Sequence, residues 1–470
     1  MIIKGLNTET YKVRLHTITP VYIGCGDEYD LTSFWVDRQK GELVEFMPEA
    51  FVSLLSEDEK NILGNIGLLE LARLINQKKP KGISKKICLN LVQKYEKVLY
   101  KQQTELNKFE IKKTAFNPTD NMPYVPGSSL KGALRTGYIA SLCPKLSYKN
   151  GKSCIDETGL LGGNFDRSPF SALKVSDFMT VVKDNCSPIS IVFAKRVSKK
   201  RKNVVKEPPV TMLEIINPGT VFEGTISLTK NNNIPANNII PKPQPLPEIC
   251  SILECVDRYS FSLLEDEKMG IRNPPIEKIR GIKNSFGKKA YLCRIGGYIG
   301  AESHTIQGCR KIKIRNPKNK QDIREYSTMT VYASPQEKMR GNSGITLGWC
   351  FLEIVEDDTL TENKCLADFA AEQMKTLLPE KTENSIGQSQ KNHTVCNKQN
   401  LKTSVVPSQQ KMSFDKNGVY DAEVIKMSKK GKPIAKSHGS EFTVMDAVDL
   451  KIGDKIKITK INGTTCRINE

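Results

Sequence analysis

The stretch Tyr124-Val-Pro-Gly-Ser-Ser-Leu-Lys-Gly-Ala-Leu-Arg135 combines a short extended entry, a turn at Pro126-Gly127 and the start of a helix. We expect Ser128 or Ser129 to cap that helix, because a serine hydroxyl accepts a hydrogen bond from a free backbone N–H group at a helix start. The remaining free N–H groups and the helix dipole attract anions. The stretch therefore predicts a helix start that is suited to hold an anion.

Two cations in the same stretch point to phosphate. Lys131 and Arg135 lie four residues apart, so a helix places both side chains on one face. Gly127 and Gly132 have no side chains and would let the backbone of a ligand come close. Two interpretations stay open, a phosphate-binding site and an ordinary capped helix with a solvated cationic face.

Composition narrows the class of partner. The 470 residues contain 71 Lys and Arg against 52 Asp and Glu, a formal charge of +19. This excess favours a polyanion, of which nucleic acid is the commonest. The sequence has neither an apolar run of about 18 residues nor a signal-type N-terminus, which argues against a membrane partner. Thirteen cysteines without a CxxC pair, and four histidines, indicate a reduced, cytoplasmic protein without a metal or other cofactor.

The N-terminal pattern predicts a mixed α+β domain over residues 1–180. Residues 11–23 alternate between apolar and polar, as in a half-buried strand, and Gly24-Cys25-Gly26-Asp27 is expected to form a turn. Amphipathic patterns at 48–77 and 86–108 predict helices. We therefore expect a sheet domain that carries a helical insert near residues 48–108.

Strand patterns after this domain predict a second sheet domain over residues 181–379. A basic run, residues 195–202, lies between two of its strands and includes Lys199, Lys200 and Arg201. Such a run is either a finger that contacts RNA or a solvated loop.

The C-terminal part differs in composition. Residues 380–410 are rich in Gln, Asn, Ser and Lys, which predicts a flexible linker. Residues 411–470 contain short strands separated by glycine turns, which predicts a small β-barrel. The segment Leu450–Ile458 resembles strands of nucleic-acid-binding barrels of the OB type, and an SH3-like docking barrel is the alternative.

Four separated pieces resemble the RAMP superfamily, the RNA-binding subunits of CRISPR systems. They are Leu15–Gly26, Pro123–Arg135, Pro169–Asp177 and Ile295–Gly300. In this order they are similar to the subunits of type III-A effector (Csm) complexes. The long helical insert favours the fifth subunit, which caps the 3′ end of the crRNA, since the repeating backbone subunits are shorter.

The resemblance implies two ferredoxin-like (RRM-like) domains whose glycine-rich loops hold the crRNA. It implies a non-catalytic subunit in crRNA maturation and antiviral defence. Its partners would be crRNA, target RNA, other RAMP subunits, above all the repeating backbone subunit, and host nucleases that trim the 3′ end. Together with the charge patterns it gives these candidate RNA-binding residues: Gly24, Gly26, Ser128, Ser129, Lys131, Arg135, Lys199, Lys200, Arg201, Arg294, Gly296, Gly297 and Tyr298.

Three alternatives remain. The chain could be an endoribonuclease with His304, or less suitably His16, as general base. Clustered carboxylates of Asp27, Glu28 and Asp30 could hold a cation for RNA cleavage, although Asp is also expected next to a glycine turn. Finally, the chain could be an RNA-binding protein unrelated to CRISPR that reads RNA with the C-terminal barrel.

Overall fold

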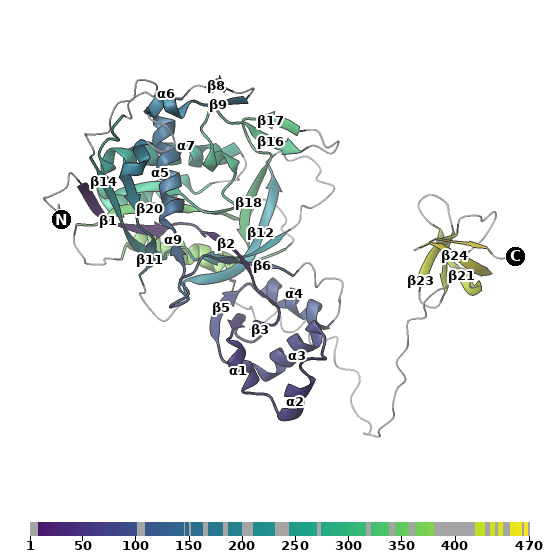
Figure 1. Cartoon of the computed structure of the whole chain (residues 1–470). Helices are drawn as coiled ribbons and strands as arrows, with labels where there is room; N and C mark the ends of the chain where they lie inside the picture. Colours follow the sequence, from purple (N-terminus) through teal and green to yellow (C-terminus); the bar gives the residue numbers. More distant parts are fainter. Residues whose placement is uncertain are drawn as a thin grey trace. The chain divides into compact units, whose positions relative to one another are not determined.

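The computed structural model forms two compact units, residues 1–385 and 386–470 (Figure 1). It describes these ranges: 8–100, 109–144, 146–149, 152–162, 168–181, 187–199, 210–230, 244–269, 274–315, 321–337, 344–356, 362–379, 419–427, 433–437, 440–444, 452–462 and 465–468. The predicted linker at 380–410 lies outside these ranges. Each unit is described by itself below.

The first sheet of the larger unit is built around β1 (Thr8–Thr17). This strand pairs antiparallel with β14 (Val221–Thr229) on one side and with β20 (Trp349–Ile354) on the other. The sheet continues with β15 (Ala290–Arg294), β10 (Leu173–Val175), β11 (Phe178–Thr180) and β7 (Tyr124–Val125). An N-terminal strand therefore lies between strands that are far away in the sequence.

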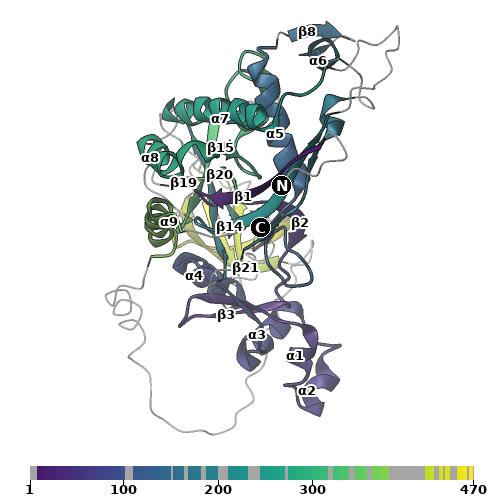
Figure 2. The same cartoon turned by 90° about the vertical axis from the view of Figure 1, so that its left-hand side faces the viewer.

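Two long helices, α5 (Gly127–Ser141) and α7 (Ile249–Asp266), pack against each other over the first sheet (Figure 2). Leu130 and Leu134 of α5 and Val256 of α7 share one core with strand residues such as Leu15 and Phe222. On the other face of β20, Trp349 and Phe351 pack with residues of α8 (Ile276–Phe286) and α9 (Lys364–Leu377). Because strand residues alternate between faces, β20 is buried on both.

The second sheet has the order β2-β6-β13-β12-β5-β4-β3. Its strands are β2 (Gly24–Glu28), β3 (Phe34–Asp37), β4 (Glu42–Glu45), β5 (Ile83–Ile87), β6 (Ile111–Thr114), β12 (Ile189–Ser198) and β13 (Thr211–Ile216), with β18 (Met329–Ser334) and β19 (Ile345–Thr346) attached through β12. Both sheets take strands from either side of residue 180. Division at that point would separate β1 from β14 and β5 from β12.

A buried carboxylate on β13 joins the strands of the second sheet. Glu214 Oε1 accepts a hydrogen bond from the Tyr29 hydroxyl at 2.6 Å and lies 2.7 Å from Lys85 Nζ. Its Oε2 accepts the backbone N–H of Thr114 at 2.9 Å. The ammonium of Lys85 also lies 2.9 Å from Glu45. A buried carboxylate is tolerated when its oxygens are paired in this way, so Glu214 holds the insert strands β4 and β5 to the main body.

The helical insert is more divided than its pattern predicts. It contains α1 (Pro48–Val52), α2 (Glu57–Ile62), α3 (Leu68–Lys78) and α4 (Leu89–Tyr100), with β5 before α4. Ser56 accepts the N–H of Glu59 while the Glu59 carboxylate accepts that of Ser56, which starts a new helix within the predicted helix at 48–77. Residues 101–108 of the second predicted helix lie outside the described ranges.

The predicted turn at Gly24–Asp27 is wrong. These residues belong to the edge strand β2, which pairs with β6 through a bulge. Gly26 has φ +94°, a conformation that favours glycine. The glycine at this position is therefore explained by the bulge in β2 and not by a turn.

The remaining described elements of the larger unit are α6 (Glu157–Leu161) and two hairpins, β8–β9 (Leu146–Lys149, Lys152–Ile155) and β16–β17 (Ile312–Arg315, Gln321–Arg324), with short 3₁₀ turns at 169–172, 267–269, 287–289 and 301–304.

The smaller unit is a closed barrel with the strand order β21-β22-β23-β25-β24. Its strands are β21 (Val419–Met427), β22 (Pro433–Ser437), β23 (Ser440–Val444), β24 (Lys455–Asn462) and β25 (Thr465–Ile468). Apolar side chains fill its interior, among them Ala422, Ala435, Phe442 and Ile458. Closure pairs the edges of the sheet, so five short strands suffice for a separate unit.

Candidate nucleic-acid interface

The helix of the central stretch begins without a serine cap, so that prediction is wrong. Pro126 occupies the cap position of α5 and no side chain there accepts a hydrogen bond. Instead, the Asp177 carboxylate accepts the N–H of Gly127 at 2.8 Å. A Cβ atom at Gly127 would lie 2.3 Å from the carbonyl oxygen of Val175, so this glycine permits close approach of the chain's own backbone. The helix start therefore already has an anionic partner within the chain.

Lys131 is the cation of the central stretch that stays unneutralised. Burial lowers the pKa of Lys131, and the neighbouring ammonium of Lys174 on β10 lowers it further. Within the described ranges, neither ammonium lies at ion-pair distance from a carboxylate. We call Lys131 and Lys174 the lysine pair. Two neighbouring ammonium groups repel each other, so an anion bound between them would be stabilised by both.

Arg135 shares the helix face of Lys131 but has an internal partner. Its guanidinium forms an ion pair with Glu157 of α6 and lies 5.8 Å from the centre of the Phe170 ring. Both partners of the ion pair are partly exposed, so the pair is weak in water. Lys131 is thus the cation of this face without a described carboxylate partner, and Gly132 has open space around it.

Arg294 supports the core. Its side chain is 8% exposed, as is that of Glu267, and the two form an ion pair at 2.8 Å. The guanidinium also donates to the Leu347 carbonyl at 3.0 Å and lies 4.5 Å from the centre of the Trp349 ring. Burial lowers the pKa of Arg294 and raises that of Glu267, and the pairing opposes both shifts. Arg294 is thus a buried residue with internal partners, and its predicted contact with RNA stays a prediction.

The glycine-rich loop after Arg294 packs on the segment that follows β1. Gly297 donates its N–H to the Tyr22 carbonyl at 2.7 Å, and a Cβ atom at Gly296 would lie 2.5 Å from the same oxygen. Tyr298, at φ +61°, places its ring edge-on to that of Tyr22, with centres 5.4 Å apart. The glycines thus serve an internal contact, and their predicted contact with RNA stays a prediction.

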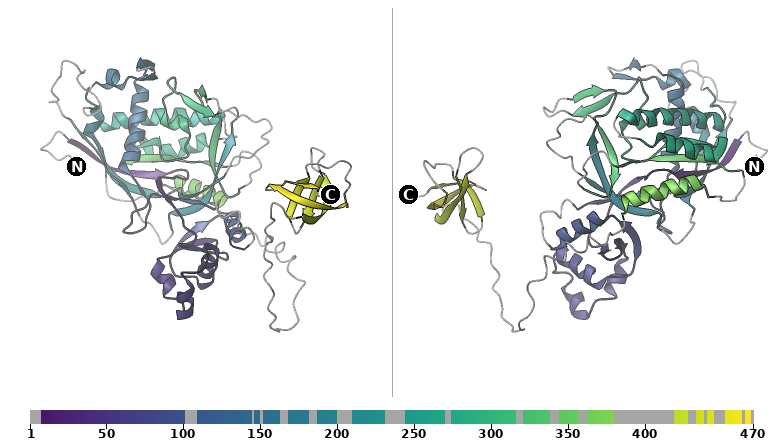
Figure 3. Two further views of the ribbon diagram at one scale, coloured as in Figure 1. Left: turned by 45° about the vertical axis from the view of Figure 1, so that its right-hand side comes forward. Right: turned by 180° about the vertical axis from the view of Figure 1, so that it is seen from behind.

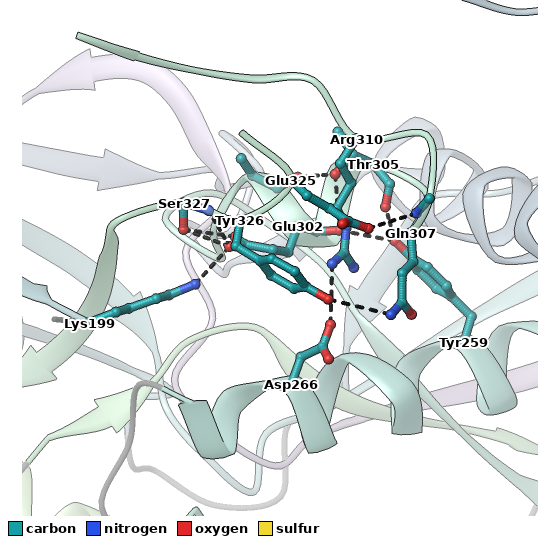
Figure 4. Close-up of polar contacts among 12 residues, drawn as sticks. Lys199, Tyr259, Asp266, Glu302, Thr305, Gln307, Arg310, Glu325, Tyr326 and Ser327 are labelled. Atoms are coloured by element: carbon teal, nitrogen blue, oxygen red, sulfur yellow. Dashed lines mark hydrogen bonds and ion pairs between the residues drawn. The ribbon is translucent and has the colours of Figure 1, made fainter. Parts of the chain in front are cut away.

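The basic run, residues 195–202, begins within β12 and is described only as far as Lys199. Its ammonium lies 2.7 Å from Glu302, which also accepts hydrogen bonds from Ser327 (Figure 4). Burial alone would raise the pKa of Glu302, but these bonds outweigh it and lower the pKa to about 2. Lys199 is therefore held in an internal ion pair. Lys200 and Arg201 lie outside the described ranges.

Gly24 and Gly26 lie on the exposed edge strand β2. A Cβ atom at Gly24 would approach the Tyr22 hydroxyl at 3.2 Å, whereas Gly26 has open space around it. Ser128 is exposed and Ser129 is half-buried at the start of α5. A contact of these four residues with RNA stays a prediction.

The two candidate general bases lie on different elements, His304 in the 3₁₀ turn 301–304 and His16 on β1. Burial lowers the pKa of His304, with a further contribution from Arg294, and no described side chain hydrogen-bonds to its ring. The ring of the buried His16 lies 2.8 Å from the Glu353 carboxylate. Of the carboxylates near β2, Glu28 pairs with Lys112 at 3.3 Å and Asp30 accepts from Thr32 at 2.8 Å. In the described ranges no three His, Cys, Asp or Glu side chains are grouped to hold a metal ion.

Two basic features escaped the sequence reasoning. Lys174 lies within the piece Pro169–Asp177, but nothing in the sequence pairs it with Lys131. The segment 310–324, Arg-Lys-Ile-Lys-Ile-Arg-Asn-Pro-Lys-Asn-Lys-Gln-Asp-Ile-Arg, carries seven cations against one carboxylate. Its positive charge and its strand alternation could have predicted a nucleic-acid contact, since clustered cations on a β-ribbon are typical of nucleic-acid-binding proteins.

Comparison with known proteins gives a partial match to one family. The model of the RAMP superfamily matches residues 14–246, just under half of the chain. Over these residues the chain is similar to this superfamily. A curated relative, the CRISPR system Cms protein Csm5 of Methanocaldococcus jannaschii, is 34% identical over 136 residues, which cover 28% of this chain and 30% of that protein. The match thus spans less than a third of the relative's length.

Two solved structures are similar at low sequence identity. A chain of the cryo-EM structure of a Csm-crRNA-target RNA ternary complex in the type III-A CRISPR-Cas system has a TM-score of 0.47 and 15% identity, with coverage of 73% of this chain and 100% of that chain. The crystal structure of T.onnurineus Csm5 has a TM-score of 0.39 and 16% identity, with coverage of 60% of this chain and 89% of that chain.

No helix in the described ranges is long and apolar enough to cross a membrane.

Proposed function

We propose that the chain is a crRNA-binding subunit of a type III-A CRISPR effector complex, similar to Csm5, and that it binds RNA without cutting it. The observation that carries this proposal is the lysine pair. Lys131 and Lys174 both lie within the residues matched by the RAMP model, and neither has a described carboxylate partner. The identity of 34% to a Csm5 protein points to the type of subunit.

The proposed ligand is the phosphate backbone of crRNA. Phosphate contacts dominate the affinity of proteins for nucleic acid, and a chain with a formal charge of +19 is suited to them. In this proposal the subunit caps the 3′ end of the crRNA, lies next to target RNA and contacts the repeating backbone subunit. Host nucleases would trim the 3′ end, and the complex would act in antiviral defence in the cytoplasm.

We also propose a ferredoxin-like core for the first sheet. The support is the chain order β1, α5, β11, β14, α7, β20, which is a βαββαβ sequence. In the sheet these strands have the order β20-β1-β14-β11, and both helices pack over one face. The second sheet would then be built from segments inserted between these elements.

For the smaller unit we propose an OB-type barrel. Five strands close through β21, which pairs with both β22 and β24, and β23 runs parallel to β25. Five-stranded Greek-key barrels of this kind commonly bind oligonucleotides. The barrel would provide a second contact with nucleic acid.

Gentle purification of the tagged chain from its own cells tests the assignment. We expect other RAMP subunits to co-purify, together with short RNAs that share a repeat-derived 5′ end. The assignment fails if the chain is recovered alone on mixed cellular RNA, a result that would move the RNA contact to the barrel. A parallel preparation with Lys131→Ala and Lys174→Ala should contain less of the short RNA.

A further inference from the structure

The hairpin β16–β17 is a separate two-stranded ribbon on the larger unit. Its strands pair only with each other among the described strands, with Lys313 opposite Ile323 and Ile312 opposite Arg324. It lies at the periphery, beside β18 (Figure 3). The segment 310–324 that contains it carries a net charge of +6, from seven cations and one carboxylate.

The two faces of the ribbon differ in burial. Ile312 is 8% exposed and faces the body of the unit. Successive residues of a strand point to opposite faces, so Lys313 lies on the outer face together with its cross-strand partner Ile323, and Lys311 lies just before β16. Both lysines are exposed, and Ile323 is 63% exposed. Within the described ranges neither lysine forms an ion pair. The outer face thus carries an exposed aliphatic side chain beside ammonium groups that have no described ion pair.

The root of the hairpin, meaning the residues just before β16 and just after β17, is fixed to the larger unit on both sides. Arg310, just before β16, has a buried side chain whose Nη1 lies 3.3 Å from the Asp266 carboxylate of α7. Its guanidinium lies 5.2 Å from the centre of the ring of Tyr326, two residues after β17 (Figure 4). The hydroxyl of Tyr326 accepts a hydrogen bond from the Gln307 side chain at 3.4 Å. The ribbon is therefore held in one orientation on the unit.

Glu302 joins the same root to the end of β12. Its carboxylate accepts the N–H of Ser327 at 2.7 Å and pairs with Lys199 at 2.7 Å. Lys199 also donates its backbone N–H to the Thr328 carbonyl at 2.9 Å. Lys199 and Arg310 at the root are therefore neutralised internally, and Arg324 pairs with Asp322 at 3.4 Å, whereas Lys311 and Lys313 form no described ion pair. The positive charge that a ligand can reach therefore lies on the outer face of the hairpin.

We infer that the outer face of hairpin β16–β17 binds a single-stranded polynucleotide, with Lys311 and Lys313 on phosphate groups and Ile323 against a base. Charge complementarity selects a polyanion. An exposed aliphatic side chain among the cations suits a strand whose bases are unpaired, because such bases offer apolar faces. The inference rests on the proposed function, which supplies RNA as the polyanion, and adds a contact remote in sequence from the lysine pair.

The test measures binding of a labelled, unstructured single-stranded RNA to the full chain over a range of salt concentrations. For Lys311→Ala with Lys313→Ala we expect weaker binding and a slope of log affinity against log salt that is smaller by about 1.4, or about 0.7 for each phosphate contact. Ile323→Ser should weaken binding several-fold and leave the slope unchanged, because this contact is uncharged. Lys364→Ala with Lys375→Ala on α9 is the matched control, since both lysines are exposed and have no described ion pair.

The outcomes separate this inference from the proposed function. If the wild-type chain binds no RNA, both fail. If it binds RNA and the double hairpin variant has the wild-type affinity and slope, the hairpin inference alone fails. The inference also fails if the α9 control loses as much slope as the hairpin variant, because the effect would then follow net charge and not position.

Discussion

The glycine-rich loop with Arg294 and the hairpin β16–β17 lie close in sequence, yet the cation of the loop is buried and paired whereas the lysines of the hairpin are exposed. Arg294 is buried against Glu267 and Trp349, and the loop glycines pack on Tyr22. On the hairpin, Lys311 and Lys313 are exposed and without a described ion pair. A basic residue is available to a ligand only when the chain itself provides no carboxylate for it. The loop with Arg294 stabilises the fold, whereas the lysines of the hairpin are exposed and can contact a ligand.

The largest effect should follow from Arg294→Ala. The change leaves the Glu267 carboxylate buried without its partner, which typically costs about 3–5 kcal/mol. Denaturant unfolding of the variant measures this loss, and the additional change Glu267→Gln should restore part of it. A variant that is as stable as the wild type but binds RNA more weakly would instead support the RNA contact predicted for Arg294.

Glu302→Gln should have the next largest effect. The folded pKa of about 2, against an ordinary 4.5, corresponds to about 3 kcal/mol of stability from the ionised carboxylate. A lowered folded pKa means that this contribution is complete above pH 4.5 and is lost as the pH falls towards 2. The difference in unfolding free energy between wild type and variant should therefore shrink over that interval. A difference that is constant with pH would contradict the role given to the Lys199 and Ser327 bonds.

The two glycines of the central stretch should give smaller effects of opposite sign. Gly127→Ala forces a Cβ atom towards the Val175 carbonyl and should destabilise the fold by about 1–3 kcal/mol. Gly132→Ala has open space and should stabilise α5 by about 1 kcal/mol. Thermal unfolding measures both. If RNA passes over Gly132, the stabilised variant should also bind RNA less tightly, whereas equal destabilisation by both changes would contradict the geometry.

Local patterns predicted much of the fold. Alternation within residues 11–23 located β1, and the helix after Pro126 begins where the central stretch places it, because these signals depend on neighbouring residues. The pairing of β1 with β14 and β20 could not be predicted, since it depends on contacts between distant segments.

The candidate site was predicted less well for the same reason. Spacing placed Lys131 and Arg135 on one helix face, but it could not show that Glu157 pairs with Arg135 or that Lys174 approaches Lys131. The partner of a charged side chain is a property of the tertiary fold. Charge counts alone would have found the hairpin, whose cations are local in sequence.

The salt dependence of RNA binding by Lys131→Ala with Lys174→Ala tests the central claim most directly. If the lysine pair holds phosphate, the slope of log affinity against log salt should fall by about 1.4, while the Lys364→Ala with Lys375→Ala control should keep the wild-type slope. A lysine-pair variant with the affinity and slope of the wild type would contradict the account.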